Sequence, residues 1–341
     1  MINFDDIITG QWYFITELDV VSLQTSDNSV AFSVVDANGS VILNESYVPY
    51  DGAVNIRFMV ALLTPYITEV AADFVLTCGN TSKTVHVVQC RTMVDEPAMT
   101  FLPSFWLTTV MTERDTAVGR KELLTVLPIE ATVPDVVASA SYWNGTQVVT
   151  ASRTLAQGLT SGAVTEVDVS AALMVDNTLG TLVGYTVTCG ERTMRYRVAA
   201  LNTADVAMLM RNTFGAWEAV YFAGMSESSP EYTRDSAMVN GALKLYHIDE
   251  VDSVKCWTGP MRPSGVDLAR DLARSTDVVL LSRGAAAAAV VITGTEMKHT
   301  TADTDLADLT VTWRRASPIS TELKAKRIPR LFDETFDETY N

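Results

Sequence analysis

The stretch that decides how this chain is organised runs Arg211-Asn212-Thr213-Phe214-Gly215-Ala216-Trp217-Glu218-Ala219-Val220-Tyr221-Phe222-Ala223-Gly224. Two related β-rich segments precede it, and a different segment begins with it. From Trp217 onward, bulky and small side chains alternate with a period of two, which is typical of a strand packed on a core. Because large aromatics carry much of the buried area of a small β domain, we expect Trp217 to anchor that core rather than to stack on a ligand.

The composition is that of soluble globular modules. The 341 residues are 48% hydrophobic and 19% charged, which suits about two or three domains that each bury a core. The net charge of −16 argues against nucleic acid as a partner, because binding a phosphate backbone takes a basic surface. The longest apolar run, 285–292, is far shorter than the roughly twenty residues that span a bilayer, so we expect no membrane insertion.

The four cysteines and the N-terminus indicate the compartment of synthesis. Cys78, Cys90, Cys189 and Cys256 are far apart and form no C-x-x-C pair, which is neither a zinc nor a redox pattern. We expect them to be reduced, buried thiols. The first residues show no basic region followed by an apolar one, so no export signal is expected. Both observations fit synthesis in a cytoplasm.

An internal repeat organises the first two segments. Asn38-Gly39 is a hairpin signal, because both residues tolerate positive φ, and Asn144-Gly145 repeats it. Residues 54–57 recur as 167–170, and residues 74–79, which end in Cys-Gly, recur as 185–190. The spacing implies a longer loop in the second copy between its Asn-Gly turn and its next strand, where insertions are tolerated.

Each copy has short strands with regularly spaced turn signals, which predicts tandem immunoglobulin- or fibronectin-like β-sandwiches. We place them at residues 1–95 and 96–203, with Pro97 marking the junction. Neither copy has the Cys-Trp-Cys spacing of antibody domains. The prediction therefore depends on strand count and on the repeat.

The third segment, 204–320, is predicted to be a divergent β-rich module, either a modified sandwich or a different small α+β fold. Leucines and alanines spaced four apart predict one short amphipathic helix near 265–275. Strands are expected at 278–281, 287–293 and 309–314. The fold class expected for the whole chain is therefore mainly β.

Short motifs of the third segment carry a family resemblance. These are Arg-Asn-Thr-Phe-Gly-Ala-Trp-Glu at 211–218, Asp-Leu-Ala-Arg-Ser at 271–275, the strand 309–316 that ends in Arg-Arg-Ala, and the terminal segment 331–341. Together they resemble uncharacterised virion structural proteins encoded by phages and prophages of Bacteroides-type bacteria, over about residues 205–341. The resemblance implies a tail- or baseplate-associated β protein that is part of the virion.

The end of the chain, 321–341, has the pattern of an assembly arm. The aromatic residues Phe332, Phe336 and Tyr340 are four apart, so a helical turn would place them on one face with the acidic residues outside. Together with Ile328 they would dock on a neighbouring subunit. The alternative is a solvated, frayed terminus.

No motif identifies a catalytic reaction or a cofactor. His247 lies close to Asp249, Glu250 and Asp252, the best local cluster for metal or acid–base chemistry. No second histidine stands at ligand spacing, so we interpret 247–252 as a polar turn. No phosphate-binding loop or nucleophile elbow is present either. We therefore expect neither an enzyme nor a metal or cofactor site.

Three tryptophans are candidates for stacking on a ligand. Trp106, Trp143 and Trp257 lie near expected strand ends or turns, as sugar-stacking tryptophans do in carbohydrate-binding modules. Core or interface packing is the commoner role of such residues.

Two functional hypotheses follow. The first is a non-enzymatic component of a tailed-phage virion, a tail, baseplate or fibre-attachment protein that forms a homo-oligomer and contacts other virion proteins. The alternative is an adhesin-like module that binds a receptor or a host surface glycan through its loop tryptophans.

Overall fold

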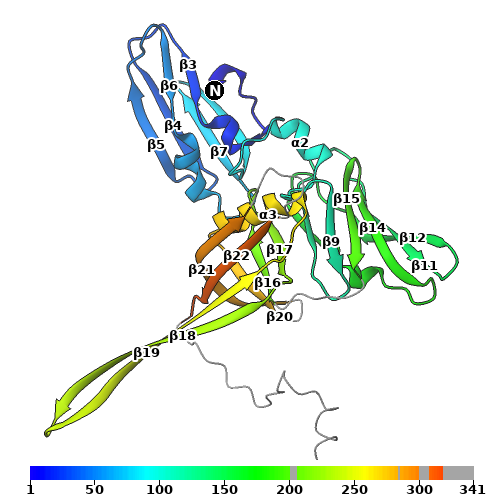
Figure 1. Ribbon diagram of the computed structural model, residues 1–341. Helices are drawn as coiled ribbons and strands as arrows, with labels where there is room; N and C mark the ends of the chain where they lie inside the picture. Colours follow the sequence, from blue (N-terminus) through cyan, green and yellow to red (C-terminus); the bar gives the residue numbers. More distant parts are fainter. Residues whose placement is uncertain (200–205, 283–284, 299–306, 318–341) are drawn as a thin grey trace, which may run out of the picture.

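The computed structural model describes residues 1–199, 206–282, 285–298 and 307–317. It is mainly β, with two sandwich-like modules side by side, a third module beneath them and a long hairpin that projects from the third (Figure 1). None of the helices in the described part of the chain is both long and apolar enough to cross a membrane.

The first module packs a five-stranded sheet against a three-stranded one, in the orders β2-β8-β7-β4-β5 and β1-β3-β6. Side chains along β4 alternate between buried and exposed, as expected of a strand with one face on a core. Phe32 and Phe74 are fully buried between the sheets. The strands are β1 (Ile2–Asn3), β2 (Trp12–Phe14), β3 (Val21–Gln24), β4 (Val30–Asp36), β5 (Val41–Tyr47), β6 (Ala53–Ile56), β7 (Ala71–Cys78) and β8 (Thr81–Val88), with one short helix, α1 (Met59–Leu63).

The second module repeats this topology. Its sheets have the orders β12-β11-β14-β15-β9 and β10-β13, and β9 runs parallel to β15 as β2 runs parallel to β8. Asn38-Gly39 and Asn144-Gly145 join equivalent strand pairs, which confirms the predicted sandwich modules. The strands are β9 (Glu113–Ala117), β10 (Leu123–Val126), β11 (Val136–Trp143), β12 (Val148–Ala156), β13 (Thr165–Asp168), β14 (Thr181–Cys189) and β15 (Arg192–Ala199).

The segment after Pro97 is a helix, α2 (Ala98–Ser104). Its Phe101 and Leu102 are buried in the core of the first module, while the Leu102 carbonyl accepts a hydrogen bond from the buried Arg192 side chain of the second, at 2.8 Å. The connection between the sandwiches is therefore packed on both of them.

The third module is one antiparallel sheet of seven strands, in the order β17-β16-β20-β21-β22-β19-β18, with helix α3 (Pro263–Arg274) packed on it. Ala269 and Leu272 of the helix are buried against the sheet, which confirms the predicted amphipathic helix. The strands are β16 (Val206–Arg211), β17 (Trp217–Phe222), β18 (Ser226–Val239), β19 (Ala242–Trp257), β20 (Val278–Ser282), β21 (Ala285–Lys298) and β22 (Asp308–Arg315).

Two predictions for this module are wrong. The core side of β17 carries Val220 and Phe222, whereas Trp217 is only half-buried beneath the Arg211 guanidinium, 4.4 Å from its ring. The alternate face of β17 packs on the second module, so both faces are covered and alternation alone could not identify the core side. Residues 247–252 are not a turn: they lie within β19 and pair with β18.

Candidate functional site

Residues 211–224 begin with a tight turn, at 212–216, where the three modules meet. Asn212 Oδ1 accepts hydrogen bonds from the backbone N–H groups of Phe214 and Ala216, both at 3.0 Å. The Asn212 side-chain amide donates to the Leu107 carbonyl of the second module at 3.0 Å. An asparagine side chain that replaces backbone partners in this way closes a turn locally.

Gly215 allows this turn to approach the first module. Its φ of 76° lies in the left-handed region, and a Cβ atom there would be 2.5 Å from the Glu69 carbonyl oxygen. Only glycine avoids both the strain and the clash. The neighbouring Thr213 carbonyl accepts the Arg91 backbone N–H at 3.1 Å, so the turn is also hydrogen-bonded to the first module.

Two of the motifs that carry the sequence resemblance meet at this turn. The Thr213 backbone N–H donates to Asp271 Oδ2 of α3 at 2.6 Å, and the Thr109 hydroxyl donates to the same oxygen at 2.6 Å. Asp271 is buried, and burial raises its pKa although both hydrogen bonds oppose the shift. The motifs 211–218 and 271–275 are therefore parts of one junction.

Glu218 is the polar centre of the contact between the second and third modules. Its side chain is 1% exposed and accepts hydrogen bonds on both oxygens. Oε1 accepts from the Thr108 hydroxyl at 2.7 Å and from Arg114 at 2.9 Å, while Oε2 accepts from the Asn212 amide at 2.8 Å. A buried carboxylate is stable only with such partners, so the contact holds β17 in one place.

Arg114 also faces a second buried carboxylate. Its Nη2 lies 3.7 Å from Glu122 Oε2 and donates to the Ala219 carbonyl at 2.7 Å. Glu122 Oε1 accepts from the Thr116 hydroxyl at 2.9 Å, whereas Oε2 has no hydrogen-bond partner among the described residues. Burial raises the pKa of Glu122, and the charge of Arg114 only partly offsets this effect.

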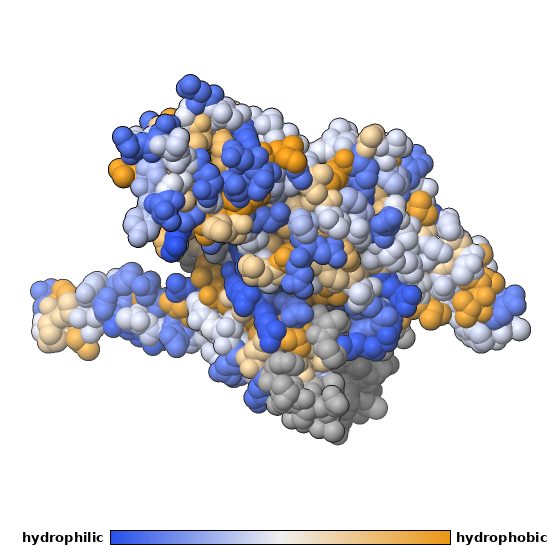
Figure 2. All heavy atoms as spheres, turned by 90° about the horizontal axis from the view of Figure 1, so that it is seen from above, coloured by the Kyte–Doolittle hydropathy of each residue, from blue (hydrophilic) through white to orange (hydrophobic). Residues whose placement is uncertain are grey.

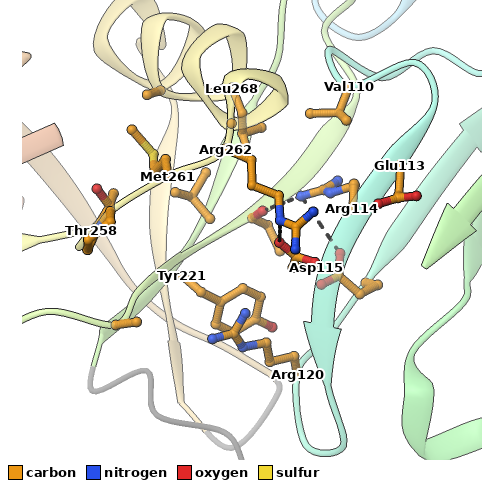
Figure 3. Close-up of a pocket in the computed structure, with 17 residues that line it drawn as sticks. Val110, Glu113, Arg114, Asp115, Arg120, Tyr221, Thr258, Met261, Arg262 and Leu268 are labelled. Carbon is orange, nitrogen blue, oxygen red and sulfur yellow. Dashed lines mark hydrogen bonds and ion pairs between the residues drawn. The ribbon is translucent and has the colours of Figure 1, made fainter. Parts of the chain in front are cut away.

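Beside this network is a cavity of about 280 Å³ between the two modules. Figure 3 shows Arg262 reaching toward Asp115, with Nε 2.9 Å from Oδ2, and the Arg120 guanidinium beside the Tyr221 ring, 4.7 Å from its centroid. Met261 and Leu268 form part of an apolar wall. Arg262 pairs with Asp115 and Arg114 with Glu122 at this cavity. We therefore interpret it as the edge of the polar contact that joins the two modules.

The raised pKa of Glu122 predicts a pH dependence of stability. Above the ordinary value of 4.5 and up to the raised folded value, the folded protein holds a proton that the unfolded chain releases. The free energy of unfolding should therefore fall as the pH rises through this window. In Glu122→Gln this contribution should disappear, as measured by urea denaturation at a series of pH values. The exposed Glu191→Gln is the control; an unchanged slope in Glu122→Gln would contradict the prediction.

The structure separates the three candidate tryptophans. Trp106 is 1% exposed in the core of the second module, so its ring is not available to stack on a ligand. Trp143 is 46% exposed at the end of β11 and stays a candidate. Trp257 is half-buried at the base of β19, with Lys255 Nζ 5.4 Å from its ring. The arm residues Ile328, Phe332, Phe336 and Tyr340 lie outside the described residues.

The acidic cluster around His247 does not converge on a metal-binding arrangement. His247 Nε2 is 3.8 Å from Asp249 Oδ1, and both side chains are largely exposed on β19. Within the described residues, no group of three histidine, cysteine or acidic side chains could hold a metal ion.

The most exposed structural feature is the hairpin of β18 and β19. These strands have 14 and 16 residues and are paired along their whole length, but only Ser253–Trp257 at the base of β19 also pair with β22. Beyond that base, no third strand among the described residues covers the hairpin, which extends away from the body of the molecule (Figure 1). A two-stranded hairpin is marginally stable on its own in water. Contact with another protein surface would therefore stabilise this segment.

One face of the hairpin carries a cluster of exposed apolar side chains, concentrated toward the tip. Directly paired residues point to the same side, so the pairs Met238–Leu243, Ser236–Leu245 and Arg234–Ile248 share a face with the pair Tyr232–Glu250. We call Tyr232, Met238, Leu243, Leu245 and Ile248 the apolar face; these side chains are between 46% and 70% exposed. Hydrophobic atoms gather at the end of the projecting arm in Figure 2.

A β-bulge creates this face. Leu245 and Ile248 are three residues apart and would point to opposite sides of a regular strand. The register shifts between Asp235 and Ser236, which leaves Tyr246 as the extra residue and brings Leu245 onto the side of Ile248.

The sequence does contain a signal for this hairpin, although the predicted strands do not include it. Asn240-Gly241 joins the two strands with φ values of 53° and 77°, so it is the same turn signal that identifies the repeated modules. His247, Asp249, Glu250 and Asp252 make the later part of β19 polar, which is why the sequence pattern favours a turn at 247–252.

Comparisons with known proteins add little. No protein-family model and no curated protein matches the chain. A chain of the solved structure described as "Tail of empty GTA particle computed with helical refinement, C6 symmetry" is similar at 13% identity and a TM-score of 0.25, over 35% of this chain and 96% of that one. A similarity of this size defines neither the fold nor the function of the protein.

Proposed function

We propose that this protein is a non-enzymatic structural component of a tailed-phage virion, a tail, baseplate or fibre-attachment protein that works by oligomeric assembly. The observation that carries the proposal is the projecting hairpin with its exposed apolar face. A contiguous apolar patch on a monomer costs free energy in water and is typical of a surface that another protein covers.

The rest of the molecule suits such a role. The turn at 212–216 is hydrogen-bonded to the first module through Arg91, to the second through Leu107 and to α3 through Asp271. These contacts hold the three modules in one arrangement, from which the hairpin projects in a fixed direction. The resemblance of residues 211–218 and 271–275 to virion structural proteins agrees with this proposal.

The place of the protein in a particle can be tested directly. We expect mass spectrometry of density-purified phage particles to recover it at a fixed ratio to the major capsid protein. A ratio that corresponds to three, six or twelve copies would indicate a symmetric position in a tail. Its absence from particles would contradict the virion proposal.

The hairpin makes a second prediction. Leu245→Lys places a charge in the apolar face and should abolish oligomers of the purified protein in light scattering. It should leave the free energy of unfolding within about 0.5 kcal/mol, because the side chain is exposed. Thr233→Lys, on the opposite face of the hairpin, is the matched control and should assemble normally. Equal behaviour of the two variants would argue against assembly through the apolar face.

Trp143 supports the alternative, a glycan-binding role. Its ring is 46% exposed and precedes the Asn144-Gly145 turn at one end of the second module. If this alternative holds, binding on a glycan array should be lost in Trp143→Ala and kept in Val148→Ala, which changes an exposed residue on the paired strand. No binding by the unaltered protein would leave assembly as the proposed function.

A further inference from the structure

The sheet of the third module has a strand edge that lacks a neighbour. β20 pairs with β21 only as far as Val290, whereas β21 continues to Lys298. In the described part of the chain, the outer edge of 291–298 has no strand partner for its backbone N–H and C=O groups. An edge of this kind is a template for a further strand.

A groove of about 350 Å³ lies beside that edge. One side is formed by the end of α3 and the start of β20, and the other by β21 itself. None of the side chains that line it is charged: they are Ala273, Ser275, Thr276, Val278, Val290, Val291, Ile292, Thr293, Gly294 and Thr295. The groove therefore combines free backbone groups with an uncharged lining.

Other edge strands of the molecule are protected in the usual way. β5 carries Glu45 and β12 carries Arg153, and charged side chains on an edge discourage pairing with another chain. Residues 291–295 carry no charge. The charged residues of the β21 edge, Glu296 and Lys298, come after this stretch, so 291–295 is the uncharged part of that edge.

The hairpin contains a segment that matches this edge. β18 is the outer strand of the sheet, and its first part is protected by Pro230, Glu231, Arg234 and Asp235. Its last residues, 236–239, are Ser-Ala-Met-Val and carry no charge. Residues 236–239 of β18 therefore match the groove beside β21 in having no charged side chain.

We propose that residues 236–239 of one copy pair as an added strand with residues 291–295 of a second copy. The hairpin cannot reach its own groove, because its paired strands hold the tip away from the body (Figure 1). Each copy then donates a hairpin and accepts another, and this head-to-tail contact closes a ring or extends a helical filament. The inference rests on the proposed assembly function and names the partner as a second copy of the chain.

Cysteine cross-linking between differently tagged copies tests the pairing. Ala237→Cys in one copy and Thr293→Cys in the other, both with the partly buried Cys78 replaced by serine, should give a cross-linked heterodimer under mild oxidation. Ser152→Cys on the edge strand β12 replaces Thr293→Cys in the matched control and should give none. In addition, Thr293→Lys should abolish oligomers while Ser152→Lys keeps them.

The outcomes separate this inference from the proposed function. A heterodimer that forms with Thr293→Cys and not with Ser152→Cys supports the pairing. Oligomers in which Ala237→Cys cross-links only to itself would show hairpin-to-hairpin contact and overturn this inference, while assembly stands. Oligomers without either cross-link overturn it in the same way. If the unaltered protein stays monomeric at all concentrations, both the inference and the proposed assembly function fail.

Discussion

Arg114→Leu should lower the free energy of unfolding by about 3–5 kcal/mol, because it leaves two carboxylates buried without their shared counter-charge. Glu218 and Glu122 are each 1% exposed, and Arg114 is 6% exposed between them. Neither acid can regain solvent without opening the contact between the second and third modules. Urea denaturation followed by tryptophan fluorescence measures the loss.

The control for this variant is Arg262→Leu. Arg262 pairs with Asp115 at 2.9 Å beside the same cavity, but both side chains are about half exposed. Exposed ion pairs contribute about 0–1 kcal/mol, so the control should be close to the unaltered protein. Adding Glu122→Gln to Arg114→Leu should recover part of the loss, since one uncompensated charge is removed. If Arg114→Leu and Arg262→Leu lower the free energy of unfolding equally, the buried network does not stabilise the contact between the modules in the way proposed.

Phe214→Ala should cost about 3–5 kcal/mol, the range for a large aromatic removed from a packed core. Phe214 belongs to the third module by sequence but is 1% exposed in the core of the first. Its ring centroid is 5.4 Å from that of Phe101 and 5.9 Å from that of Phe14. The variant should loosen the first module from the rest, seen as faster proteolysis and faster amide exchange in residues 1–95.

Phe58→Ala is the matched control because Phe58 is 75% exposed. An exposed side chain away from any special contact changes stability by about 0.5 kcal/mol or less. A Phe214→Ala protein that unfolds at the same urea concentration as Phe58→Ala would show that the junction core contributes little. The prediction for Phe214 would then be wrong.

Arg114→Leu and Phe214→Ala both test whether the junction between the modules is rigid. Buried polar groups require a specific geometry, and buried aromatics supply most of the burial free energy at the junction. Together they make a rigid base for the hairpin. A hairpin on a mobile base would present its apolar face in many directions, which a symmetric assembly cannot use.

Local signals explain why much of the fold was predictable from the sequence. Asn38-Gly39 and Asn144-Gly145 mark turns through backbone geometry alone, so they identified the repeated hairpins without knowledge of their neighbours. The helix near 265–275 was visible because its apolar residues recur at the helical spacing. Both signals depend on residues close together in the chain.

Contacts between distant segments could not be predicted in this way. Trp217 looked like a core residue, but β17 is covered on both faces, and only the packing of the second module shows which face meets which core. Trp106 precedes the strands of its module in the sequence and is buried, because the fold makes it part of the core of the second module. The candidate site also depends on contacts between distant segments. Glu218 and Arg114 are far apart in the sequence, and no local pattern around either residue predicts that they pair.

The sequence by itself determined the β class, the repeat, the turns and the short helix, since these follow from side-chain period and from residues that tolerate positive φ. Only the tertiary structure decided that Asn212, Phe214 and Glu218 form a three-way junction and that the hairpin carries an apolar face. The physical reason is that burial and charge pairing depend on which surfaces meet in space. A single β-bulge, which no local sequence pattern predicts, places Leu245 and Ile248 on the same side of the hairpin.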